Sequence, residues 1–130
     1  MSNGPSQGQI EAAIGVLVTR FFREMVGHGP RSVSVTLRPH ALFIHLQGAL
    51  TKVEERMVRC PSSDAQRCAA MVREMRDHLV RQGRESLMAA LAGTLGHPPH
   101  GMMHDLNAET GEEVIVFSLS VPVEASARRA

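Results

Sequence analysis

Gly27-His28-Gly29-Pro30 is the stretch that decides the fold, because it closes one helix and starts a pair of strands. Ser6 and Gln9 form a capping-box pair, which predicts that this helix starts near Ser6. Gly27 favours a left-handed stop, and Pro30 cannot continue a helix, so the chain must turn there. Before the loop, apolar residues recur at the spacing of a helix with one buried face: Ile10, Ile14, Leu17, Phe21 and Met25.

Two runs of alternating residues follow the loop. Residues 33–37 alternate between aliphatic and polar side chains, which predicts a strand with one buried face. After a turn at residues 38–40, the run 41–46 is apolar on both faces, and the two runs predict a hairpin. Thr51 and Glu54 then form a second capping box, which predicts that a helix begins directly after this hairpin.

The middle of the chain predicts two more helices. Ser63 and Gln66 offer a third capping pair for the first of them. Gly83 is expected to separate it from a second helix at residues 85–94, the alternative being one continuous helix with a weak point at Gly83. The first of these helices is expected to bury a stripe made of Cys68, Val72, Met75 and Leu79.

The last part of the chain predicts a second hairpin, with strands at residues 102–106 and 114–121 joined by a turn. The element order α-β-β-α-α-β-β predicts an α+β, two-layer sandwich: a four-stranded, mostly antiparallel sheet with helices on one face. We expect three segments: a partly flexible leader at residues 1–8, one domain at residues 9–121 and a flexible tail at residues 122–130.

Composition excludes several classes of protein. Although 43% of the 130 residues are hydrophobic, no apolar run approaches the roughly 20 residues that cross a bilayer. The start of the chain lacks a secretory signal, so we expect a cytoplasmic protein without membrane insertion. Net charge is +1 and Trp and Tyr are absent, which argues against a nucleic-acid partner. The wide spacing of Cys60 and Cys68 predicts unpaired thiols.

One candidate ligand site combines the glycine loop with the second capping box and the helix after it. Loop amides could cradle an anion, although a helix stop followed by a turn also explains the loop. Two arginines one helical turn apart could clamp a carboxylate, or they could form a solvated helix face. The candidate ligand-binding residues are Gly27, His28, Gly29, Pro30, Thr51, Glu54, Arg73 and Arg76.

A second candidate site is a metal centre at His97, His100 and His104, with Asp105 adjacent. Imidazole and carboxylate ligands suit zinc or another divalent ion, while adventitious loop histidines are the alternative interpretation. Nucleophile elbows, phosphate-binding loops and dinucleotide fingerprints are absent from the sequence, so we predict no catalytic residue and no cofactor.

Apolar residues beyond those needed for one core predict a homodimer. The run 41–46 is apolar on both faces, and Met71 lies off the predicted buried stripe of its helix. Methionine is common in adaptable interfaces as well as in uneven cores. One apolar surface is therefore expected to contact a second subunit.

The order and spacing of four segments resemble the MpsC-like family, small bacterial proteins named after a Na⁺-translocating, membrane-potential-generating system. The segments are residues 27–30, 48–54, 72–76 and 114–119, and the resemblance covers roughly residues 9–120. The family usually carries Arg where this chain has His28, and usually a plain hydrophobic strand where this chain has residues 98–103. Asp105 stands where the family tends to carry an acidic residue.

The resemblance implies a soluble accessory or regulatory protein associated with membrane ion transport or bicarbonate supply, which binds a membrane-transport protein at the periphery of a membrane complex. It implies no catalytic residue. The alternative from the residues themselves is a small ligand- or anion-binding protein, or an enzyme, with its site near the Gly27–Pro30 loop, Thr51 and Arg76.

Overall fold

The computed structural model describes residues 4–59 and 63–123. Its element order confirms the predicted α+β class. The elements are α1 (Gln7–Met25), β1 (Ser32–Arg38), β2 (Ala41–Gln47), α2 (Lys52–Val58), α3 (Ala65–Gln82), α4 (Arg84–Leu95), β3 (Gly101–Asn107) and β4 (Glu112–Ser118).

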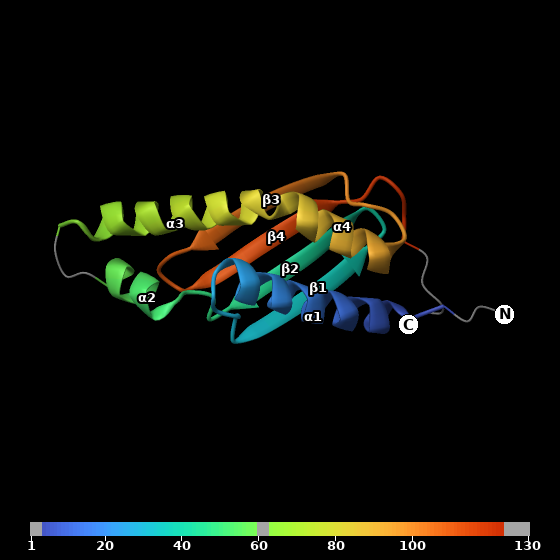
Figure 1. The fold of residues 1–130 in the computed structure, drawn as a ribbon, viewed down its shortest axis with the longest axis horizontal. Coiled ribbons are helices and arrows are strands. Elements are labelled where there is room, and N and C mark those ends of the chain that lie inside the picture. The colour runs from blue at the N-terminus through green and yellow to red at the C-terminus, as the bar shows by residue number, and fades with distance from the viewer. Residues whose placement is uncertain (1–3, 60–62, 124–130) are drawn as a thin grey trace.

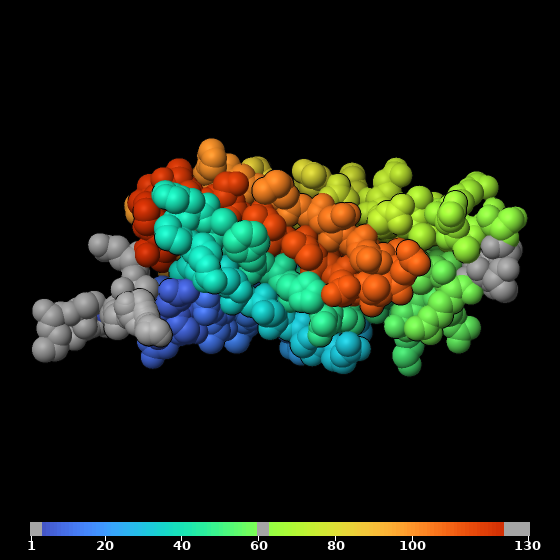
Figure 2. Space-filling view, turned by 180° about the vertical axis from the view of Figure 1, so that it is seen from behind, coloured from blue at the N-terminus to red at the C-terminus, as the bar shows by residue number. Residues whose placement is uncertain are grey.

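The four strands form one open sheet in the order β1-β2-β4-β3, with every pairing antiparallel. Helices α1, α3 and α4 lie across one face of this sheet (Figure 1). No helix of the described residues lies on the opposite face, where the strands form the surface seen from behind (Figure 2). The central strands β2 and β4 come from different hairpins, so their pairing joins the two halves of the chain.

Two of the three predicted helix starts are confirmed. Ser6 caps α1, and its hydroxyl accepts a hydrogen bond of 3.1 Å from the Gln9 amide. Thr51 caps α2 in the same way, and both capping boxes are complete. The third prediction was wrong by one residue, because Asp64 rather than Ser63 stands at the N-cap position of α3.

Gly83 separates α3 from α4, as predicted, and a close contact explains why glycine is needed there. A Cβ atom on Gly83 would lie 2.5 Å from Cε1 of Phe21, nearer than real Cβ contacts come. The ring of Phe21 therefore packs directly on the helix junction. Gly27, just after α1, has a φ of 81°, which is the left-handed stop expected from the sequence.

The described residues form two hydrophobic clusters. The larger one lies between α1, α4 and the inner face of the sheet, and Ile14, Ile44 and Phe117 are fully buried in it. The smaller one joins Leu50, Val72 and Leu106 beneath α2 and the first turns of α3. Polar side chains meet on the sheet between these two clusters, and they form the candidate site.

The predicted buried stripe of α3 was right at Val72 and wrong at Met75. The residues that α3 buries are Val72, Arg76 and Val80, whereas Met75 is 47% exposed. The buried face includes Arg76 because the buried carboxylates of Glu54 and Glu113 bind its guanidinium.

Candidate functional site

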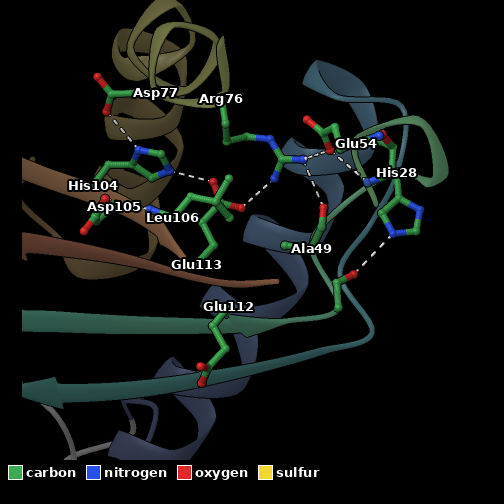
Figure 3. A network of polar contacts seen from close by, with 12 residues as sticks. His28, Ala49, Glu54, Arg76, Asp77, His104, Asp105, Leu106, Glu112 and Glu113 are labelled. Carbon is green, nitrogen blue, oxygen red and sulfur yellow. Dashed lines mark hydrogen bonds and ion pairs between the residues drawn. The ribbon is translucent and has the colours of Figure 1, made fainter. Parts of the chain in front are cut away.

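Arg76 is the centre of a buried ion network. Its side chain is completely buried, and it lies in the middle of α3, facing the sheet. Nη2 donates to Oε1 of Glu54 at 2.5 Å and to the carbonyl of Ala49 at 3.0 Å, while Nη1 donates to Oε1 of Glu113 at 2.7 Å (Figure 3). Its Nε is buried and makes no hydrogen bond within the described residues. The guanidinium thus joins three segments that are distant in sequence.

Glu54 has two roles at once. It is the third residue of the α2 capping box, where Oε1 accepts a hydrogen bond from the amide of Thr51 at 2.8 Å. The same oxygen accepts the hydrogen bond from Arg76, and the Glu54 residue is only 3% exposed. The start of α2 is therefore attached to α3 through one carboxylate oxygen.

Glu113 continues the network across the sheet. It lies on the inner face of β4, between its register partners Leu46 on β2 and Leu106 on β3, and it is fully buried. Its Oε2 lies 2.6 Å from Nε2 of His104, which points inward from β3. One carboxylate therefore bridges an arginine and a histidine.

His104 carries the network out to the surface. Nδ1 of its ring lies 2.9 Å from Oδ1 of Asp77 on α3, and Oδ2 of Asp77 accepts a hydrogen bond of 2.8 Å from Nε of Arg81. The imidazole side chain is 1% exposed, while that of Asp77 is 38% exposed. The network is thus closed at Arg76 and open to solvent at Asp77.

The geometry favours the doubly protonated form of His104. An ionised carboxylate only accepts hydrogen bonds, and His104 has one at each ring nitrogen, so both nitrogens are satisfied only when both carry a proton. Burial by itself lowers the pKa of His104, but the hydrogen bonds and charges of Glu113 and Asp77 outweigh burial and raise it above the ordinary value. With His104 charged, three carboxylates face two guanidiniums and one imidazolium, and the network is neutral.

Asp77 shows the complementary effect. Its partial burial raises the pKa of the carboxyl group, but the hydrogen bonds and positive charges of Arg81 and His104 more than offset this and lower the pKa.

Outside the network, on the uncovered face of the sheet, hydrogen bonds from Thr110 and His45 also lower the pKa of the Glu112 carboxyl group.

The network brings together three of the predicted ligand-binding residues and leaves the others apart. Thr51, Glu54 and Arg76 meet, but Arg76 and Glu54 are buried and bind each other. His28 lies on the exposed loop, where its Nε2 is 3.3 Å from the carbonyl of Gly48. Arg73 lies one turn from Arg76 on the exposed side of α3 and lines a separate hollow. Ligand binding by the full set therefore stays a prediction.

The three predicted metal ligands lie in different surroundings. His97 and His100 are exposed between α4 and β3, whereas His104 points into the network with both nitrogens engaged. Within residues 4–59 and 63–123, no group of three or more His, Cys, Asp or Glu side chains is arranged to hold a metal ion. The metal centre at His97, His100 and His104 stays a prediction.

Three network residues, Glu113, Asp77 and Arg81, were not among the sequence candidates. Glu113 stands just before the predicted strand at residues 114–121, and Asp77 was interpreted as part of a helix surface. The partners of Glu113 lie on α3 and β3, and His104, one partner of Asp77, lies on β3. One signal in the sequence does point to Glu113: it stands in phase with Ile115 and Phe117, the inward-facing residues of β4. A charge at a buried phase requires a partner of opposite charge.

Fold and network define a small α+β protein whose interior charges bind one another. Residues 6–121 match the family described as "Na+-translocating membrane potential-generating system (MpsC)", and the chain belongs to that family. It is 29% identical over 119 residues to a Bacillus subtilis (strain 168) protein called "Uncharacterized protein YbcI", with 92% of each chain covered. No solved structure gives a significant match. No helix among the described residues is both long and apolar enough to cross a membrane.

Proposed function

We propose that this chain is a non-catalytic accessory protein that forms a homodimer through the uncovered face of its sheet and acts beside a membrane-transport protein. The observation that carries the proposal is the apolar character of that face. Phe43, Met103 and Val114 are 44%, 58% and 38% exposed there, although each stands on a strand of the folded sheet. Apolar patches of this kind are typical of protein interfaces.

The register of the sheet groups these side chains at the centre of the face. Val116 on β4 stands between Phe43 on β2 and Met103 on β3, and Val114 stands between His45 and Asp105. The flanking strand β1 contributes the polar side chains of Ser32, Ser34 and Thr36. An apolar centre with a polar rim is the usual anatomy of an interface.

A second copy of the same face suits this pattern. A two-fold axis parallel to the strands places β2 of one copy over β4 of the other. The interface then contains two equivalent contacts, each between Phe43 of one copy and Val116 of the other. Four seven-residue strands, with about 3.3 Å per residue and about 4.8 Å per strand, give a flat face of roughly 440 Å². A stable complex buries roughly 800 Å² per partner, so the projecting side chains must add to this flat area.

The absence of a catalytic role is supported by the way the interior charges are used. In the described chain, the carboxylates of Glu54, Glu113 and Asp77 and the imidazole of His104 each bind another member of the network. Hydrogen bonds of this kind fix the positions of these four groups and leave none of the four as an unpartnered nucleophile or base. The connection to membrane transport rests on the family description alone.

Light scattering during size-exclusion chromatography at micromolar concentration is expected to give the mass of a dimer. Replacing Phe43 and Met103 by serine is expected to give a monomer that remains folded, because both side chains lie outside the core. Val16→Ser with Val53→Ser is the matched control, since these residues are 62% and 69% exposed on helices. A monomeric wild-type chain would contradict the proposal.

The transport connection is tested by affinity purification from native membranes in mild detergent. We expect the tagged chain to recover an ion-transport protein, and the tagged transport protein to recover this chain in return. An unrelated protein with the same tag is the control. If no transport protein is enriched in either direction, the accessory role is wrong, whatever the result for the dimer.

A further inference from the structure

A basic groove lies between α1 and the edge strand β1, away from the ion network. Its volume is about 500 Å³. Val16, Thr19 and Arg20 are among its lining residues on α1, and Pro30 and Val33 lie on the other wall. Ligand pockets are commonly of this size, from about 300 to 1,000 Å³.

The charged residues that line the groove are all arginines. Arg20 and Arg23 lie one helical turn apart on α1, and Arg31 lies at the start of the opposite wall. All three are exposed, and none forms an ion pair with a carboxylate of the described chain. On a chain whose net charge is only +1, three unpaired arginines around one groove are a local excess of positive charge.

Other polar side chains in the groove are already engaged. Thr19 donates its hydroxyl hydrogen to the carbonyl of Gly15 at 2.8 Å, and Ser32 donates to Oε1 of Gln47 at 3.1 Å. The arginines therefore provide the available donors. Guanidinium groups bind phosphate and carboxylate with paired, charge-assisted hydrogen bonds.

Two glycines of the sequence motifs make room for these arginines. A Cβ atom on Gly29 would lie 3.1 Å from Cγ and Nε of Arg23, and one on Gly48 would lie 2.7 Å from Cβ of Arg31. Gly48 also has a φ of 63°, which favours glycine. The small residues of the loop and of the β2 end thus allow the arginine stems to lie against the backbone beside the groove.

We propose that this groove binds a soluble, phosphorylated small molecule, with the phosphate held by Arg20, Arg23 and Arg31 and the rest of the molecule resting on Val16 and Val33. A phosphate ester carries about −1.5 to −2 charge and three acceptor oxygens, so one group can accept from arginines on both walls. A single carboxylate offers one charge and two oxygens. The groove is larger than an inorganic phosphate and partly apolar, which suits a ligand with an organic body.

Isothermal titration calorimetry with inorganic pyrophosphate and with ADP tests the site. Both probes are expected to bind the wild-type chain, and ADP is expected to bind more tightly because its nucleoside contacts Val16 and Val33. The triple variant R20Q/R23Q/R31Q is expected to lose at least about tenfold in affinity, since hydrogen bonds to charged groups are removed. If the triple variant misfolds, Arg23→Gln alone is expected to show a smaller loss in the same direction.

The matched control is R56Q/R67Q/R84Q, which removes the same charge from exposed positions on α2, α3 and α4. It is expected to bind both probes as the wild type does. Equal losses in the two triple variants would mean non-specific attraction and would overturn the site. So would no detectable heat with pyrophosphate at millimolar concentration, or binding only to vesicles that contain phosphatidylglycerol. None of these outcomes depends on the dimer or on a transport partner.

Discussion

Replacing Arg76 with methionine is expected to lower the free energy of unfolding by about 3–5 kcal/mol. The substitution leaves the carboxylates of Glu54 and Glu113 buried without their shared cation, and a buried charge without a partner is costly. Because small domains have a total stability of about 5–15 kcal/mol, the loss is a large part of it. Urea unfolding measures the change. Far-ultraviolet circular dichroism is the suitable signal, because the chain has neither Trp nor Tyr to report unfolding by fluorescence.

Arg73→Met is the matched control, because Arg73 lies one turn earlier on the same helix but is exposed. This change is expected to alter stability by no more than about 0.5 kcal/mol. The combination R76M/E54Q/E113Q is expected to recover part of the loss, since it removes the unpaired charges as well. Equal stability of the Arg76→Met and Arg73→Met variants would show that the network does not hold α2 and α3 to the sheet.

The parts of the fold that the sequence predicted are those determined by neighbours along the chain. The capping boxes at Ser6 and Thr51 depend on residues three positions apart, and both are present. The stop at Gly27 and the break at Gly83 were also predicted, although the contact with Phe21 that requires the second glycine is visible only in three dimensions. The strands were predicted from alternation at residues 33–37 and from runs of apolar, strand-favouring residues elsewhere.

The centre of the network could not be predicted in the same way, because the bonds of Arg76 join distant segments. Arg76 lies 22 residues from Glu54 and 37 from Glu113. Arginine in a helix is usually exposed, so the predicted stripe of α3 passed through Met75 and left Arg76 outside the core. A useful indication was present: Arg76 is in phase with Val72 and Val80.

The residues predicted for the two candidate sites lie in different surroundings in the structure. Arg76, Glu54 and Thr51 were expected near one another and do meet, but in a closed network instead of around a ligand. His104 was interpreted as a metal ligand from its spacing to two other histidines. Its phase with Met102 and Leu106 on β3 directs it inward, where Glu113 and Asp77 occupy its two nitrogens.

The second large effect is expected in the pH dependence of stability, and His104 is its source. The pKa of His104 is raised in the folded protein, so folding binds its proton more tightly than the unfolded chain does. The resulting stability is fully present below the ordinary histidine pKa of about 6.5 and is lost as pH rises through the higher folded value. Above that value, a nitrogen lone pair faces the buried carboxylate of Glu113 or that of Asp77.

Asp77 sets the acid side of the same window. Its pKa is lowered by Arg81 and His104 against the effect of burial, so its contribution is present above the ordinary aspartate pKa of about 4 and is lost as pH falls through the lower folded value. The ion network is therefore expected to stabilise the protein most between about pH 4 and 6.5.

His104→Gln separates this contribution from all other titrations. The difference in unfolding free energy between wild type and variant is expected to be largest near pH 6 and to shrink toward pH 9, because only the wild type loses a network proton at this position. His28→Gln, on the exposed loop, is the control and is expected to follow the wild-type curve. A difference that stays constant or grows from pH 6 to 9 would show that folding does not favour the charged imidazole. The carboxylates on either side of His104 would then need another source of positive charge.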